Sequence, residues 1–193
     1  NIRLVMRKTI ETAKQVYTET DIARKPVSVV SLAYKALRDL NVDLSARVVI
    51  IGAGKTNRTM GKFLLKHGYS NFTIYNRTES RALQLAEDLK GRGLELDALS
   101  QHTGGFDVLI ACTAAKEPIV TEKIYDQLLD GETEGKVVID LAVPNDVSDG
   151  VSKRQNVRYL EVESLQEIAA KNLKSRQKEI VKCEAILAEC LKD

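Results

Sequence analysis

An apolar run leads directly into a Gly-x-Gly turn at Val48-Val49-Ile50-Ile51-Gly52-Ala53-Gly54, and a helical pattern follows. The first glycine permits a tight turn, and the second lets the backbone come close to a pyrophosphate. The phosphate would then meet the free N–H groups at the start of the helix. This order of strand, turn and helix predicts a dinucleotide-binding turn, and the alternative is a plain tight connection between a strand and a helix.

The third glycine of the dinucleotide fingerprint is absent, because Asn57 stands in its place. The larger side chain is expected to push the helix slightly away from the strand and to weaken cofactor affinity. Gly61, one turn later, is expected to restore close packing.

Strand and helix patterns alternate after this turn. Strands are expected at 47–51, 72–75, 94–96, 107–112, 136–141 and 157–160, and helices at 58–67, 79–90 and 121–129. Strands separated by helices of about ten residues imply right-handed βαβ units. The predicted fold class is therefore α/β, a Rossmann-type doubly wound and mostly parallel sheet with a long C-terminal helix.

Helical patterns also flank the sheet region, at 2–17 and 28–40 and again near the C-terminus. Ser164 and Glu167 form a capping box, and apolar residues continue from there at helical spacing to Leu191. Such a helix would be ~40 Å long, more than one small sheet can cover. We therefore divide the chain into a leading helix and linker (1–26), an NADP-binding Rossmann domain (27–163) and the start of a long spinal helix (164–193).

The end of the second expected strand, Tyr75-Asn76-Arg77-Thr78, predicts which cofactor the turn selects. Units that bind NAD usually place Asp or Glu here, to hydrogen-bond the ribose 2′-OH. This strand end has no acid, and Arg77 can pair with a 2′-phosphate instead. The pattern favours NADPH, while a solvated arginine beside a helix-capping Thr78 is the alternative.

Two further loops are expected at carboxyl ends of strands, where the ligand crevice of an open α/β sheet lies. Cys112-Thr113-Ala114-Ala115 has small side chains that leave room for a nicotinamide ribose, and residues 140–146 border the nicotinamide. Cys112 is also typical of a core residue, and Asp140 and Asp146 of turn caps. The candidate cofactor-binding residues are Gly52, Ala53, Gly54, Lys55, Thr56, Asn57, Asn76, Arg77, Thr78, Cys112, Thr113, Ala114, Ala142 and Val143.

The composition argues against several other classes. The 193 residues carry a net charge of +2, which gives little long-range attraction to nucleic acid or anionic lipid. Three cysteines without CxxC spacing favour neither a disulfide framework nor a zinc site, and they indicate a reducing compartment. No apolar run approaches the ~20 residues of a membrane span. Because neither His67 nor His102 has an evident partner for acid–base chemistry, no catalytic residue is predicted.

Taken together, these motifs resemble the central domain of the glutamyl-tRNA reductase family. The matching residues are Thr18-Glu19-Thr20, Val27-Ser28, Gly52-Ala53-Gly54, Asn76-Arg77-Thr78, Cys112-Thr113, 139–144, Asn172, Arg176 and Glu179. The resemblance implies reduction of glutamyl-tRNA by NADPH to glutamate-1-semialdehyde, the entry to tetrapyrrole (porphyrin) synthesis. It also implies a cytoplasmic homodimer, joined through the C-terminal helix. One departure is Asn145, which stands where an arginine commonly follows the Val-Pro pair.

In that family a separate N-terminal domain carries the catalytic cysteine, and a dimerisation domain follows the long helix. We expect this sequence to be a piece of such a protein and to be inactive alone. Two alternatives remain open. One is an NADP oxidoreductase similar to shikimate dehydrogenase, a family that shares the Asn-Arg-Thr clamp, and the other is a non-catalytic interaction module built around the terminal helix.

Overall fold

The computed structural model describes residues 2–24 and 26–191, and the chain separates into two compact units. The first unit is Ala33–Leu165. The second consists of the described parts of 1–32 and 166–193. Within the described residues, no helix is long and apolar enough to cross a membrane.

In the described part of the first unit, six parallel strands form one sheet in the order β3-β2-β1-β4-β5-β6. The order reverses where β1 lies beside β4, as in a doubly wound Rossmann sheet. The predicted fold class is confirmed. The strands are β1 (Arg47–Ile51), β2 (Asn71–Asn76), β3 (Arg92–Glu95), β4 (Val108–Ala111), β5 (Lys136–Asp140) and β6 (Val157–Glu161).

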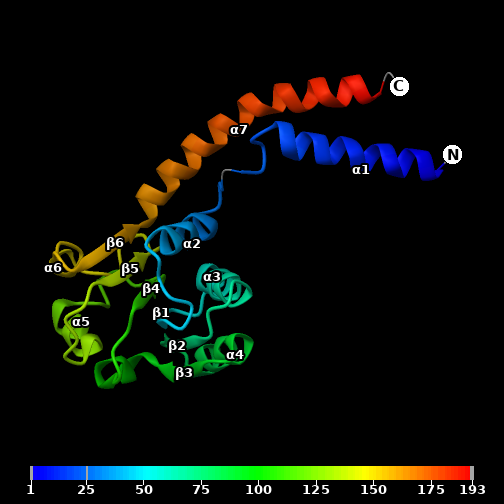
Figure 1. The fold of residues 1–193 in the computed structure, drawn as a ribbon. Coiled ribbons are helices and arrows are strands. Elements are labelled where there is room, and N and C mark those ends of the chain that lie inside the picture. Colours follow the sequence, from blue (N-terminus) through cyan, green and yellow to red (C-terminus); the bar gives the residue numbers. More distant parts are fainter. Residues whose placement is uncertain (1, 25, 192–193) are drawn as a thin grey trace. The chain divides into compact units, whose positions relative to one another are not determined.

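Helices cover both sides of this sheet, with α3 and α4 on one side and α5 and α6 on the other (Figure 1). Every residue of β4 and β5 is buried, as expected for parallel strands that are covered on both faces. The helices are α2 (Val29–Asp39), α3 (Lys55–Lys66), α4 (Glu79–Leu89), α5 (Glu122–Leu129) and α6 (Asp149–Ser152), with a 3₁₀ helix η1 at Leu96–Gln101.

The observed elements differ from the predicted ones mainly at their ends. Helix α3 begins at Lys55, three residues before the predicted start at Arg58, because the helix follows the Gly-x-Gly turn without a spacer. The sequence did not predict α6 or η1. Both are too short for a helical period to be recognised.

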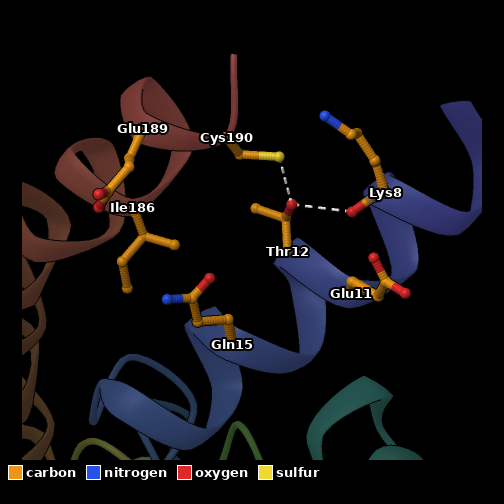
Figure 2. Close-up of a pocket in the computed structure, with 7 residues that line it drawn as sticks. All are labelled: Lys8, Glu11, Thr12, Gln15, Ile186, Glu189 and Cys190. Atoms are coloured by element: carbon orange, nitrogen blue, oxygen red, sulfur yellow. Dashed lines mark hydrogen bonds between the residues drawn. The ribbon is translucent and has the colours of Figure 1, made fainter. Parts of the chain in front are cut away.

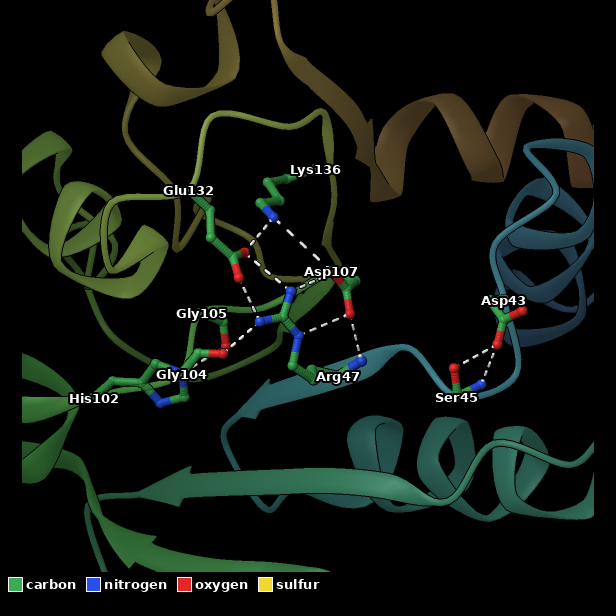
Figure 3. A network of polar contacts seen from close by, with 9 residues as sticks. All are labelled: Asp43, Ser45, Arg47, His102, Gly104, Gly105, Asp107, Glu132 and Lys136. Carbon is green, nitrogen blue, oxygen red and sulfur yellow. Dashed lines mark hydrogen bonds and ion pairs between the residues drawn. The ribbon is translucent and has the colours of Figure 1, made fainter.

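The amino-terminal edge of the sheet carries a network of charged side chains (Figure 3). Arg47, at the start of β1, pairs with Asp107 (2.6 Å between Nη2 and Oδ1) and with Glu132. Lys136, at the start of β5, is almost fully buried and pairs with Glu132 (2.6 Å). Two cations and two acids therefore neutralise one another where the strands begin.

The second unit contains α1 (Ile2–Glu19) and most of α7 (Val162–Cys190). The hydroxyl of Thr12 on α1 lies 2.7 Å from the thiol sulfur of Cys190 on α7 (Figure 2). Further along α7, Asn172 donates its amide N–H to the Pro26 carbonyl at 2.7 Å. Polar side chains of α7 therefore hold both α1 and the segment that follows it.

The predicted capping box at Ser164 is wrong. Helix α7 begins at Val162, directly after β6, so Ser164 lies inside its first turn. The Ser164 hydroxyl donates to the carbonyl of Glu161 at 2.9 Å, a contact back to the preceding strand, whereas a capping residue would accept an N–H from the next turn of the helix. The strand runs into the helix without the loop that a cap would need.

Candidate functional site

A cavity of about 480 Å³ opens at the carboxyl ends of β1, β2 and β4. This is the edge at which the strand order reverses, and open α/β sheets bind their ligands there. Three loops supply most of the wall. The lining residues are Gly52, Ala53, Gly54, Lys55, Thr56, Asn76, Arg77, Arg81, Leu96, Cys112, Thr113, Ala114, Ala115 and Ile119.

The two glycines of the turn have different surroundings. Gly52 has a φ of +96°, and a Cβ atom there would lie 2.4 Å from the Cys112 carbonyl oxygen. A side chain at this position is therefore excluded by both conformation and space. Around Gly54, no heavy atom of the described residues beyond its neighbours in the chain lies within 4 Å of the place that a Cβ atom would take. The second glycine thus leaves open space at the point where the turn enters α3.

The amino end of α3 faces this open space, because Gly54, Lys55 and Thr56 line the cavity. Gly54 occupies the N-cap position, and no side chain among the described residues caps the helix. The first turn of α3 also contains no acid. Free N–H groups and the positive end of the helix dipole attract an anion, so this helix end can hold a phosphate group.

Asn76, the last residue of β2, connects two loops of the cavity wall. Its Oδ1 accepts the N–H of Ala53 at 3.0 Å, and its Nδ2 donates to the Thr78 carbonyl at 2.9 Å. One amide thereby fixes the glycine turn relative to the loop that carries Arg77. The sequence predicted a contact between Asn76 and the cofactor, and the structure adds this bridging role.

Arg77 is exposed and lines the cavity together with Arg81, which lies one turn later in α4. Lys55 is a third cation in the lining, and among the described residues none of the three has an ion pair. Thr78 stands at the N-cap position of α4, as predicted, but its side chain makes no capping hydrogen bond there. Its hydroxyl does not line the cavity either, and a contact of Thr78 with the cofactor stays a prediction.

Two buried carboxylates hold the loops of this edge, Asp146 the loop after β4 and Asp140 the loop after β5. Asp146 accepts the N–H of Thr113 (2.6 Å) and its hydroxyl (2.5 Å). Asp140 accepts the N–H groups of Ala142 and Val147 at 3.0 and 2.9 Å. Burial raises the pKa of both acids. The prediction that Asp140 caps a turn is confirmed, because it accepts the N–H of Ala142 two residues on, whereas the side chain of Asp146 binds Thr113 on another loop.

The loop after β5 differs from the prediction in where its residues point. Ala142 is buried and Val143 is exposed, and neither lines the cavity, so their contact with the cofactor stays a prediction. Asn145 donates to the hydroxyl of Tyr159 at 3.2 Å, and Tyr159 in turn donates to Asp140 at 3.1 Å. The residue that replaces the family's arginine therefore takes part in an internal hydrogen-bond chain.

Cys112 borders the cavity, but its surroundings do not favour a thiolate. Burial is the main reason that the pKa of its thiol is raised, and the nearby Asp146 and Asp140 add to the shift. The thiol donates weakly to the Leu141 carbonyl at 3.4 Å. A thiol with a raised pKa is a poor nucleophile at neutral pH, so Cys112 contributes packing and shape to the wall.

His102, for which the sequence showed no partner, has two. Its Nδ1 lies 2.8 Å from the Tyr75 hydroxyl, and its Nε2 lies 2.9 Å from the Gly105 carbonyl oxygen. These contacts fix the loop before β4. Ala115 lines the cavity as part of the predicted loop 112–115, and the lining residues missing from the prediction are Arg81, Leu96 and Ile119. Arg81 could have been found, because it follows Arg77 by four residues and a helix starts between them.

The sequence of this chain is similar to those of known proteins. The sequence profile of the family described as Shikimate / quinate 5-dehydrogenase matches residues 31–168. Glutamyl-tRNA reductase from Psychromonas ingrahamii is 34% identical over 187 residues, which is 96% of this chain and 45% of that protein. Glutamyl-tRNA reductase from Methanopyrus kandleri is 33% identical over 97% of this chain and 47% of its own length.

The solved structure of the Methanopyrus kandleri enzyme superimposes with a TM-score of 0.86 over 99% of this chain and 49% of that one. Shikimate 5-dehydrogenase from Thermus thermophilus, at 18% identity and a TM-score of 0.53, shares the fold alone. The resemblance predicted from the motifs is confirmed. The chain spans about half the length of the glutamyl-tRNA reductases that it matches.

Proposed function

The chain belongs to the shikimate / quinate 5-dehydrogenase family, and from that premise we propose that it is the NADPH-binding domain of a glutamyl-tRNA reductase. Relatives of that name align along nearly the whole chain at 33–34% identity. The solved structures of shikimate 5-dehydrogenase from Thermus thermophilus are only 15–18% identical to this chain. The whole protein would reduce glutamyl-tRNA to glutamate-1-semialdehyde in porphyrin synthesis.

One observation carries the proposal: cations without acidic partners and free helix N–H groups surround the same cavity. The pyrophosphate of a dinucleotide would lie against Gly54 and the amino end of α3, where space is open and no side chain of the described residues caps the helix. Arg77 and Arg81 would hold the 2′-phosphate, while the small residues at 112–115 leave room for the nicotinamide end. Bound NADPH would supply a hydride, and the residues of this cavity would bind and orient the cofactor.

Calorimetric titration of the chain with NADPH and NADH tests this proposal. We expect saturable binding of both, with NADPH bound at least ~tenfold more tightly because a charge-assisted contact to phosphate contributes about 1.5–3 kcal/mol. Equal affinities would reject NADPH selection. If neither cofactor saturates a site, the cofactor domain itself is rejected and an interaction module is favoured.

We further propose the division into 1–26, 27–163 and 164–193, and a homodimer of the parent enzyme that is joined through the C-terminal helix. On α7, Ile180 and Leu187 are 44% and 49% exposed, although α1 lies against the same helix. An exposed apolar stripe on a long helix is typical of an interface, because burying it gains ~25 cal/mol per Å².

Sedimentation of the native chain and of an Ile180→Glu, Leu187→Glu variant checks this interface. The native chain should self-associate with rising concentration, and the variant should stay monomeric. Gln177→Glu with Ala188→Glu adds the same charge at exposed, less apolar positions of α7 and should associate like the native chain. A native chain that stays monomeric at high concentration would rule the interface out.

The chain alone should not reduce glutamyl-tRNA, even with saturating NADPH, because Cys112 has a raised thiol pKa and the catalytic cysteine is proposed to lie elsewhere in the parent protein. Semialdehyde that forms with the native chain and disappears in Cys112→Ser would contradict this.

The three described cysteines are free thiols, which supports a cytoplasmic location for the parent enzyme.

A further inference from the structure

Asn57 takes the place of the third glycine in the dinucleotide fingerprint, and the structure gives it a specific set of contacts. The side chain is fully buried in the first turn of α3. Its Nδ2 donates to two carbonyl oxygens at the end of β1, those of Ile51 and Gly52, each at 2.8 Å. A glycine at position 57 would make neither bond.

The bond to Gly52 acts on the peptide group at the centre of the turn. The carbonyl of Gly52 and the N–H of Ala53 belong to one planar unit. Asn57 binds the carbonyl side of this unit, and the Oδ1 of Asn76 accepts the N–H side at 3.0 Å. Two asparagines, from α3 and β2, therefore hold the same peptide plane from opposite sides.

We infer that Asn57 is a positioning residue for the dinucleotide: with Asn76 it fixes the Gly52–Ala53 peptide, and so orients the turn that receives the pyrophosphate. The inference rests on the proposed cofactor function. It reverses the expectation from the fingerprint, because restoring the usual glycine should weaken cofactor binding. Gly61, one turn after Asn57 in α3, lies against Leu89 of α4 and therefore does not help to hold the glycine turn.

The energetics of Asn57 separate positioning from simple stabilisation. Its Nδ2 gains two hydrogen bonds, while its Oδ1 is buried without a partner in the described structure. The gain from the bonds and the penalty of the orphan acceptor are of the same order. Removing the whole amide should therefore cost only modest folding stability, because the Gly52 carbonyl loses a donor while the orphan Oδ1 is also removed, and it leaves the peptide held on its N–H side alone.

The test compares cofactor affinity in Asn57→Gly and Asn57→Ala with the native chain. Both variants should bind NADPH about tenfold more weakly, and NADH should weaken by the same factor because the two cofactors share the pyrophosphate. Asn76→Ala combined with Asn57→Ala should lose less than the product of the single losses, since both residues hold one peptide. Met60→Ala, buried in α3 away from the turn, should lower the Tm and leave both affinities unchanged.

Amide hydrogen exchange at Ala53 gives a second readout that needs no cofactor. Protection of this N–H in the free chain should fall in Asn57→Gly and stay native in Met60→Ala. Unchanged protection in Asn57→Gly, or NADPH affinity equal to or tighter than native, overturns the inference. A native chain that binds neither cofactor overturns the proposed function instead, and exchange at Ala53 still decides the role of Asn57.

Discussion

At the amino-terminal edge of the sheet four charged side chains neutralise one another, whereas at the carboxyl edge three cations around the cavity pair with no acid of the described chain. Arg47 and Lys136 share Asp107 and Glu132 across the starts of three strands. Lys55, Arg77 and Arg81 stand where three loops meet. The same residue types thus stabilise the fold at one edge and are left to attract an anion at the other.

The carboxylates at the two edges differ in the same way. Hydrogen bonds from Arg47 and Lys136 lower the pKa of Glu132 to about 2, and Arg47 also lowers the pKa of Asp107. Burial raises the pKa of Asp140 and Asp146, which accept hydrogen bonds from loop N–H groups. Glu132 and Asp107 are thus held by ion pairs, whereas Asp140 and Asp146 fix the shape of loops through hydrogen bonds.

Removing Arg47 should have the largest effect on folding stability. Arg47→Ala leaves Asp107 and Glu132 with only Lys136, and it also removes a donor to the Gly104 carbonyl. A broken, partly exposed network of this kind should cost about 3 kcal/mol, less than a fully buried one because water screens the remaining charges. Urea unfolding measures the loss, and NADPH affinity should stay native.

Lys153→Ala is the matched control, because its ion pair with Asp149 is exposed on both sides. It should change stability by less than ~0.5 kcal/mol. An equally small loss in Arg47→Ala would show that the network at the amino-terminal edge contributes no more than a surface pair.

The sequence could not predict this network, although it predicted most of the sheet. The strands β1, β4 and β5 could be predicted from their own residues, because a strand that is buried on both faces is a continuous apolar run. Arg47 and its acids are separated by 60 and 85 residues. Only the strand order brings them together, and no spacing in the sequence carries that information.

At the carboxyl edge the sequence predicted the loops better than the directions of their side chains. The turn after β1, the Arg77 loop after β2 and the loop after β4 were predicted because carboxyl ends of parallel strands meet at one edge. Ala142 and Val143 were predicted on the same argument, yet one is buried and the other points to solvent. Their orientation depends on Asp140, which binds the N–H groups on both sides of that loop.

Removing Arg77 should change cofactor affinity at the carboxyl edge of the sheet and leave the charged network at the amino-terminal edge intact. Arg77→Ala should weaken NADPH binding by about 2 kcal/mol, which corresponds to roughly ten- to a hundredfold, and NADH binding should barely change. Arg38→Ala removes an exposed arginine of α2 that does not line the cavity, and both affinities should then stay native. Equal losses for the two cofactors in Arg77→Ala would contradict a 2′-phosphate contact.

The smallest expected effect, after those of Arg47→Ala and Arg77→Ala, is the contribution of Glu132 to folding stability and its dependence on pH. A carboxylate whose pKa is lowered on folding stabilises the folded state above its ordinary pKa, and this contribution is lost as the pH falls towards the folded value. For Glu132 the window runs from 4.5 down to about 2. Glu132→Gln removes the titrating group, and we expect it to cost about 1 kcal/mol at pH 6, because solvent screens this partly exposed side chain.

Asp140 and Asp146 act with the opposite sign, since a raised pKa adds stability as the pH falls through the folded value towards 3.8. The pH curve of the native chain therefore mixes both edges, and only the difference between native and variant isolates Glu132. In urea unfolding, the gap between the native chain and Glu132→Gln should be constant above pH 5 and should narrow steadily below 4.5. Glu134→Gln, an exposed change two residues away that removes the same charge, is the matched control. A Glu132→Gln gap that does not narrow in acid would mean that the charge of Glu132 does not stabilise this edge of the sheet.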